Sequence, residues 1–283
     1  MSDNFKRYLN FYEWETTLPG SGAKVKYKPI TTGQIKRLLL YGEIDDSTSI
    51  ENALDTLISE CVVTEGFNIK EQYLQDRFYL MVEIRNVTKG YKYTFPSNCF
   101  MCDSQTHQTV DLSKMVVKKL NKNVTKEDVK QTVKPTSKKK GKLELIEDVT
   151  TPVVSKTVDV PWNLVNINDN ISITLNILTR QMQEDIMELL KDSELTEEQK
   201  SAEMNILGYA IAIENIITPE GVETDLQFQD KVYFIENLTP MEKEKIDDWY
   251  VKNSFGLDFT FKVKCIHCGD ETERVIPLDS FFY

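Results

Sequence analysis

Residues 257–276 read LDFTFKVKCIHCGDETERVI, and the prediction of the fold starts from this stretch. From Leu257 to Val263 apolar and polar residues alternate, which is the pattern of a β-strand with one buried face. The strand leads into Cys265-Ile-His-Cys268, and a second strand-like run extends from Thr272 to Ile276. A strand, a CxxC turn and a second strand are typical of a zinc knuckle, whose tight turn directs two thiolates at one point.

Residues 91–112 read YKYTFPSNCFMCDSQTHQTVDL and repeat this design earlier in the chain. A strand is expected over Tyr91–Phe95, before Cys99-Phe-Met-Cys102, and another from Gln108 to Leu112. One knuckle supplies two ligands, whereas structural zinc takes four, so two knuckles that pack together complete a four-thiolate site. The sequence therefore predicts one zinc ion held by Cys99, Cys102, Cys265 and Cys268.

Other uses of these cysteines stay open. Cys102 and Cys265 are separated by 162 residues, far more than in a usual zinc ribbon. The pairs could be unmetallated turns or a redox site, although a thioredoxin-like motif should open a helix rather than precede a strand. His107 or His267 could substitute as a ligand. Cys61, on the apolar face of a predicted helix, is expected in the core.

The segments around the two knuckles share one predicted order: a strand, helices, a strand, a CxxC turn and a strand. Several helix starts are marked by a threonine with Glu or Gln three residues later, the capping-box spacing. These starts are Thr48-Ser-Ile-Glu51, Thr196-Glu-Glu-Gln199 and Thr239-Pro-Met-Glu242. Further helices are expected after Thr31 or Thr32, over about 70–84 and from Thr179. The strands that open the two segments are expected over 25–28 and 171–175. The helix that Thr196 opens is expected to include Ile213.

This order predicts an α+β fold. We expect a mostly helical body with short antiparallel strands, in two similar halves that each end in a CxxC zinc-knuckle β-hairpin. An internal duplication would explain the likeness of the halves, and a coincidence of common elements is the alternative.

Charge is unevenly distributed along the chain. The 283 residues contain 34 Lys and Arg against 45 Asp and Glu, a net charge of −11, yet residues 114–142 contain eleven Lys against two acidic residues. We therefore expect an N-terminal half over residues 1–113, a Lys-rich flexible insert or linker over 114–160 and a C-terminal half over 161–283. The lysines are interpreted either as a solvated linker or as a basic arm for nucleic acid or an acidic partner.

Little in the sequence supports catalysis. The chain has two His, which leaves few general bases near neutral pH, and it lacks both HExxH and the GxxxxGK[ST] phosphate-loop spacing. No apolar run reaches the roughly 20 residues that span a bilayer, and the first residues lack the apolar stretch of a secretory signal. Net negative charge disfavours nucleic-acid binding by the chain as a whole. Composition thus predicts an acidic, soluble, intracellular protein, and the low His count with the missing catalytic motifs predicts that it is not an enzyme.

The closing third of the chain carries a resemblance. It contains Phe234-Ile-Glu-Asn-Leu-Thr-Pro240, a helix to Tyr250, Lys264-Cys-Ile-His-Cys-Gly269 and the terminus Pro277-Leu-Asp-Ser-Phe-Phe-Tyr283. Together with Lys26-Tyr-Lys-Pro-Ile-Thr31 and Leu38-Leu-Leu40, this resembles the baseplate hub assembly chaperone or hub subunit family of T-even-type (myovirus) bacteriophages. The resemblance covers roughly residues 24–113 and 160–283. The long Lys-rich stretch and the lack of Gly after the first CxxC depart from the family pattern.

The resemblance implies a non-enzymatic protein that promotes assembly of the baseplate hub by binding other phage hub or tail proteins, without a small-molecule substrate or a membrane. It implies a place in the host cytoplasm during assembly, or in the tail baseplate of the virion. Trp249, Tyr250, Phe281 and Phe282 are candidates for a partner-binding surface, or else for packing against the zinc lobe. The alternative function is a zinc-ribbon nucleic-acid-binding protein that uses the lysines of residues 114–142.

Overall fold

A computed structural model describes residues 12–42, 47–122, 125–130, 155–191, 193–278 and 281–282. The helices are α1 (Thr32–Gly42), α2 (Ser47–Cys61), α3 (Leu74–Lys89), α4 (Arg180–Lys191), α5 (Glu197–Ala212), α6 (Phe228–Glu236) and α7 (Pro240–Lys252), with the short 3-10 helices η2 (Ile69–Glu71) and η3 (Leu112–Lys114). Within these ranges, no helix is both long enough and apolar enough to cross a membrane.

The strands are short and pair antiparallel. They are β1 (Trp14–Thr17), β2 (Lys24–Tyr27), β3 (Lys92–Asn98), β4 (Gln105–Asp111), β5 (Val117–Lys118), β6 (Thr125–Lys130), β7 (Ser155–Val160), β8 (Leu164–Asn166), β9 (Ser172–Leu175), β10 (Ile213–Thr218), β11 (Gly221–Glu223), β12 (Gly256–Leu257), β13 (Thr260–Lys264) and β14 (Glu271–Val275). One sheet has the order β11-β10-β9-β8, and the other described strands form two-stranded pairs. The α+β class with short antiparallel strands is therefore confirmed.

Three helices begin where the sequence places them. Thr196 and Thr239 each accept a hydrogen bond from the backbone N–H three residues on, while the Gln199 and Glu242 side chains accept from the backbone N–H of the threonine. Thr31 makes the same exchange with the residue three positions later, before α1. Each exchange satisfies N–H groups that a helix start leaves without an intrahelical acceptor.

Three predicted boundaries differ from the structure. The strand expected over Leu257–Val263 is divided into β12 and β13, because the Asp258 carboxylate accepts from the backbone N–H of Thr260 at 2.9 Å and turns the chain. Ile213 does not belong to a helix, since it pairs with Leu175 of β9. The helix expected over about 70–84 begins at Leu74 as α3, after η2.

The region expected to be a flexible insert contains described strands. β5 pairs with β12, and β6 pairs with β7. Residues 123–124 and 131–154 lie outside the described residues. The division of the chain into residues 1–113, 114–160 and 161–283, and the internal duplication, stay predictions.

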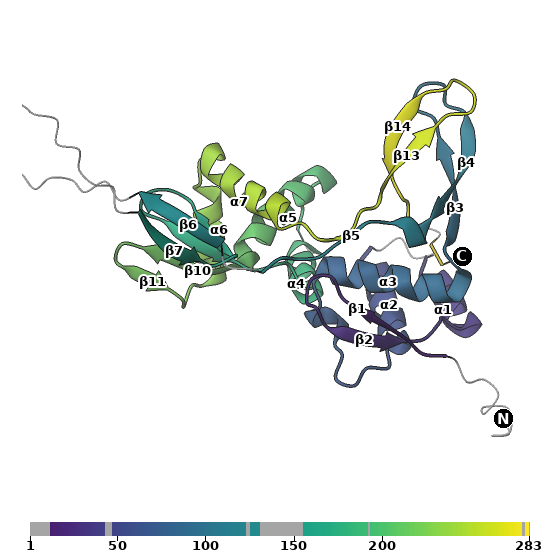
Figure 1. The fold of residues 1–283 in the computed structure, drawn as a ribbon, viewed down its shortest axis with the longest axis horizontal. Coiled ribbons are helices and arrows are strands. Elements are labelled where there is room, and N and C mark those ends of the chain that lie inside the picture. Colours follow the sequence, from purple (N-terminus) through teal and green to yellow (C-terminus); the bar gives the residue numbers. More distant parts are fainter. Residues whose placement is uncertain are drawn as a thin grey trace, which may run out of the picture.

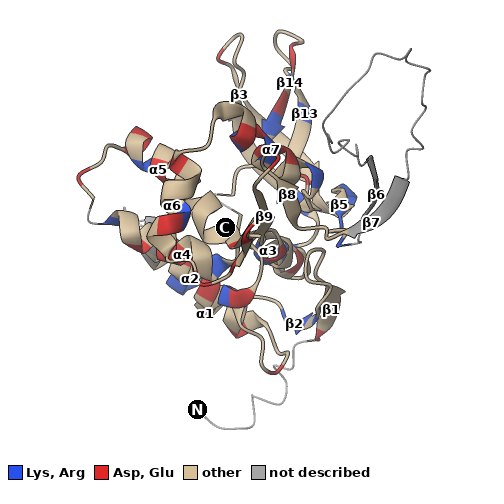
Figure 2. Cartoon of the chain, turned by 90° about the vertical axis from the view of Figure 1, so that its left-hand side faces the viewer, with Lys and Arg blue, Asp and Glu red and all other residues tan. Residues whose placement is uncertain are grey.

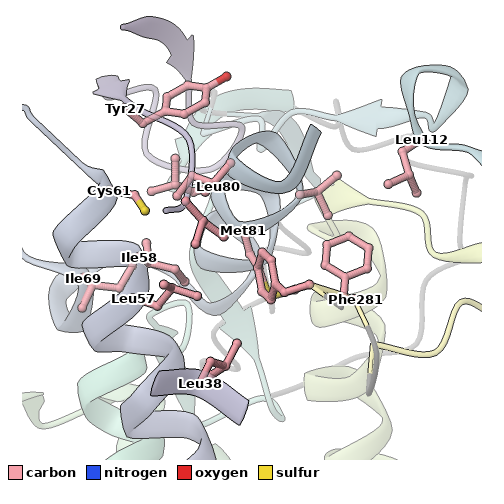
Figure 3. Packing of buried hydrophobic residues seen from close by; sticks show 14 of the residues in the cluster. Tyr27, Leu38, Leu57, Ile58, Cys61, Ile69, Leu80, Met81, Leu112 and Phe281 are labelled. Atoms are coloured by element: carbon pink, nitrogen blue, oxygen red, sulfur yellow. The ribbon is translucent and has the colours of Figure 1, made fainter. Parts of the chain in front are cut away.

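Buried apolar side chains form two clusters. The first core joins residues of α1–α3, β2 and β3 with Leu112 and, from the far end of the chain, Ile276, Phe281 and Phe282. Figure 3 shows the Phe281 ring among the other side chains of this cluster. The second core lies between α4–α7 and strands β8–β10 and includes Trp249. The last described residues are therefore packed against the N-terminal helices, although they follow the second core in sequence.

A buried ion cluster joins the two cores. The Asp55 carboxylate of α2 accepts from Arg77 Nε of α3 at 2.5 Å and from Arg180 Nε of α4 at 2.7 Å. The two arginines are only 1% and 0% exposed. Close by, the Arg180 backbone N–H donates to the carbonyl of Gln72 at 3.0 Å. Asp55, together with Glu51, whose Oε2 lies 2.7 Å from Arg77 Nη2, thus compensates two positive charges whose burial would otherwise be costly.

Two hairpins that are distant in sequence, β3–β4 and β13–β14, project side by side from the helices, and we call this pair the arm (Figure 1). β3 and β4 pair as far as Asn98 and Gln105, and β13 pairs with β14 as far as Lys264. The Phe95 and Phe261 rings meet edge to face between the hairpins, with centroids 5.3 Å apart. Because each hairpin ends in a CxxC turn, this packing brings the two turns together at the end of the arm.

Candidate metal centre

The two CxxC turns have the same backbone hydrogen bonds. In each turn the N–H of the first cysteine, Cys99 or Cys265, donates to the carbonyl five residues later, at 2.9 and 2.8 Å. The N–H four residues later donates back to that cysteine's carbonyl, at 2.9 Å in both turns. The residue at that fourth position is left-handed: Gly269 has φ 78° and Asp103 has φ 54°. Asp enters this region more readily than most side chains, which lets the first turn form without Gly.

The turns bring four sulfurs together at distances that suit a metal ion. Cys99 Sγ lies 3.6 Å from Cys268 Sγ, Cys102 Sγ lies 3.7 Å from Cys265 Sγ, and all four lie within 4.8 Å of one another. Ligands on a tetrahedron with metal–sulfur bonds of about 2.3 Å are about 3.8 Å apart. A disulfide would need about 2.05 Å, and all of these cysteines are free. Each hairpin therefore contributes two thiols to one group that could hold a metal ion.

A serine that the sequence analysis overlooked stabilises thiolates in this group. Ser104 Oγ lies 3.0 Å from Cys102 Sγ and 3.4 Å from Cys265 Sγ. Its hydroxyl, followed by the backbone N–H groups of Cys268 and His267, lowers the pKa of Cys265 to about 5. The same hydroxyl lowers the pKa of Cys102. The available signal was a hydroxyl residue two positions after the first CxxC motif.

The Cys268 thiol shows why a cation would stabilise this group of four sulfurs. The backbone N–H of Asp270 favours the Cys268 thiolate, but partial desolvation and the neighbouring thiols outweigh it and raise the pKa of Cys268 to about 12. Thiolates this close repel one another unless a positive charge lies among them. Metal binding supplies that charge and releases the thiol protons.

The other predicted ligands lie elsewhere. The group of four sulfurs includes neither His107 nor His267. His107 lies in β4, opposite Pro96 in the strand register, and His267 lies exposed in the second turn. Cys61 is 0% exposed in the first core, as expected. Within the described residues, the potential metal ligands that gather are thus the cysteines of the two knuckles.

The four aromatic candidates for partner binding are not gathered on one surface. Phe281 and Phe282 lie buried in the first core, and Trp249 lies buried in the second. The Trp249 indole N–H donates to the Trp162 carbonyl at 2.9 Å, and Tyr250 packs edge to face on Trp249. Phe281 packs edge to face on Tyr93 of β3, which agrees with the alternative of packing against the zinc lobe, whereas Trp249 and Tyr250 belong to the second core instead. A role of these residues in partner binding stays a prediction.

The chemistry of the cysteine group is that of a structural site. Four protein ligands fill the coordination shell of a tetrahedral metal, whereas a catalytic zinc keeps a position open for water or substrate. An ion bound there would cross-link residues 99–102 with residues 265–268 and fasten the two hairpins of the arm at their outer ends.

A family model described as T4 bacteriophage base plate protein matches residues 11–283. No curated protein and no solved structure matches the chain.

Proposed function

This chain belongs to the T4 bacteriophage base plate protein family, and we propose that it promotes assembly of the baseplate hub by protein–protein binding. The proposal covers an assembly chaperone and a hub subunit, which both act by holding another hub protein in place. The observation that carries it is the family match along nearly the whole chain. A baseplate protein contacts other structural proteins of the phage, so binding rather than catalysis is the activity to expect. It acts in the host cytoplasm during assembly and at the tail baseplate.

The fold supports a binding role. The two cores are joined through the buried Asp55 cluster, which links α2 with α3 and α4. At the base of the arm Arg85 of α3 donates to the Lys92 carbonyl of β3 at 2.9 Å, and an ion bound by the cysteine turns would join the two hairpins at the outer end. A rigid body with a rigid projection presents a fixed surface to a partner, which lowers the entropic cost of binding.

We also propose that the metal is zinc. Four thiolates at tetrahedral separations favour zinc or iron–sulfur chemistry over calcium, magnesium or copper(II). Each knuckle repeats the strand–CxxC–strand arrangement in which structural zinc is typically bound. Replacing the bound metal with cobalt(II) should give the visible absorption of a tetrahedral four-thiolate site. An iron–sulfur chromophore in the purified protein would contradict the assignment to zinc.

Deletion of the gene from its phage tests the proposed function. We expect tails that stall before the baseplate is complete, with infectivity restored when the wild-type protein is supplied from a plasmid. The Cys265→Ser variant supplied in the same way should restore less infectivity than the Cys61→Ala variant, because Cys61 lies outside the metal-binding group. Infectious phage with normal contractile tails after deletion would contradict the proposal.

A further inference from the structure

Three large apolar side chains are exposed at the outer end of the arm. They lie between the cysteines of the two turns, where the fourth residue is His267: Phe100 is 77% exposed, Met101 73% and Ile266 80%. Because the sulfurs of the two turns lie 3.6–3.7 Å apart, these side chains belong to adjacent turns. We call Phe100, Met101 and Ile266 the tip. Figure 1 shows that the turns between β3 and β4 and between β13 and β14, which carry the tip, lie at the end of the arm farthest from the helices.

The tip is held in place although it is exposed. The guanidinium of Arg274, in β14, stacks over the Phe100 ring at 3.8 Å from its centroid and so joins the two hairpins. The Met101 N–H lies 3.4 Å from Cys99 Sγ, to which it donates. The backbone hydrogen bonds of both turns add to these contacts. A partner would therefore meet a preformed apolar projection, with little side-chain and loop entropy left to lose.

Acidic residues outnumber basic ones beside the tip: Lys264 is paired with Glu271 at 2.9 Å, and Arg274 lies over the Phe100 ring. Asp103 and Asp270 belong to the two turns, and acidic segments mark the ends of both hairpins in Figure 2. Among the described residues, neither carboxylate forms an ion pair. A divalent ion with four thiolates would add a net charge of −2 directly beneath the apolar side chains. An apolar projection with an anionic collar is complementary to an apolar pocket with a cationic rim.

We propose that the tip is the docking point for another baseplate protein, which receives it in a concave apolar pocket bordered by Lys or Arg. This inference rests on the proposed function and adds to it the binding surface and the chemistry of the partner. Exposed apolar side chains that are contiguous and rimmed by charge mark interaction sites. The aromatic Phe100 is the kind of residue that dominates binding energy. The metal takes part by keeping the two turns in register.

The test compares two triple variants in the full-length protein. The tip variant is Phe100→Ala/Met101→Ala/Ile266→Ala. The control is Tyr233→Ala/Met241→Ala/Val251→Ala, which removes side chains of matched type from α6 and α7, with exposures of 68%, 77% and 73%. Metal content and thermal unfolding establish that both variants fold. Each purified structural protein of the phage baseplate is then immobilised in turn, and its Kd is measured.

We expect one baseplate protein to bind the wild type and the control equally and the tip variant more weakly by about tenfold or more, the size of an aromatic hot spot. Asp103→Asn/Asp270→Asn should weaken the same complex by a smaller factor and reduce its dependence on salt. Equal binding by the tip variant would overturn the tip inference while leaving the proposed function standing. Binding of no baseplate protein by the wild type would overturn the proposed function itself. Self-association through the tip, or binding only to nucleic acid, would overturn the choice of partner.

Discussion

Removal of the Asp55 carboxylate should destabilise the protein more than the loss of any surface ion pair. In Asp55→Ala, Arg77 keeps a carboxylate, because Glu51 Oε2 lies 2.7 Å from its Nη2. Arg180, which is 0% exposed, retains among the described residues only the amide oxygen of Asn52, at 3.3 Å, as a side-chain partner. Breaking a buried pair by removal of one partner costs about 3–5 kcal/mol, because the remaining charge stays buried without compensation. We expect a loss in that range, and most of it should arise at Arg180.

Urea unfolding, followed by circular dichroism, measures this loss as the change in free energy of unfolding. The control is Lys114→Ala, which removes an exposed partner of Asp111 at 3.7 Å and should cost less than about 1 kcal/mol. If the reasoning about Arg180 is right, Asp55→Ala/Arg180→Met should be more stable than Asp55→Ala alone, since the uncompensated charge is gone. A loss below about 1 kcal/mol for Asp55→Ala, or no recovery in the double variant, would refute the account of a charge-compensated junction.

The other predictions address the terminus, a helix start and a close contact. Phe282→Ala should lower the free energy of unfolding by about 3–5 kcal/mol, because Phe282 is a buried core aromatic. Weaker binding to a hub protein with unchanged stability would contradict this buried position. Hydrogen bonds from Asn168 and Thr239 lower the pKa of Glu242 to about 2, so the stabilisation that the Glu242 carboxylate gives should be lost as pH falls from about 4.5 through 2. The Glu242→Gln variant should lack this pH dependence of stability. A variant with the same pH profile as the wild type would contradict the prediction. Gly20→Ala should destabilise by about 1–3 kcal/mol, because its Cβ would lie 2.7 Å from Phe255 Cζ, whereas Gly33→Ala, with open space around it, should be neutral or better.

Local patterns predicted the elements best. Thr196 with Gln199, and Thr239 with Glu242, placed two helix starts at residue level, because a capping box depends only on neighbours in sequence. The CxxC hairpins were predictable for the same reason, since alternation and a tight turn are local features. Ile213 was assigned to a helix because helical spacing continues through it, and its pairing with the distant Leu175 decides otherwise.

Long-range placement was beyond the sequence pattern. Nothing local to Phe281 and Phe282 shows that they return to the core of the N-terminal helices, where Arg85 Nε lies 3.4 Å from the Phe281 carbonyl. In the sequence, Asp55 and Arg180 look like ordinary charged residues on the polar faces of helices. Their role in joining the two cores depends on their being buried together, which the fold alone shows. The sharing of one metal by two knuckles was inferred from the number of ligands that zinc needs, and its geometry had to come from the fold.

The metal content of the purified protein tests the shared centre most directly. We expect about one zinc ion per chain, and we expect Cys99→Ser and Cys265→Ser each to abolish zinc binding, because a site made by both hairpins cannot survive the loss of a ligand from either. The Cys61→Ala variant should bind zinc like the wild type, since Cys61 lies in the first core and not among the metal ligands. Full zinc content in either serine variant, or about two zinc ions per chain in the wild type, would contradict one metal shared between the turns.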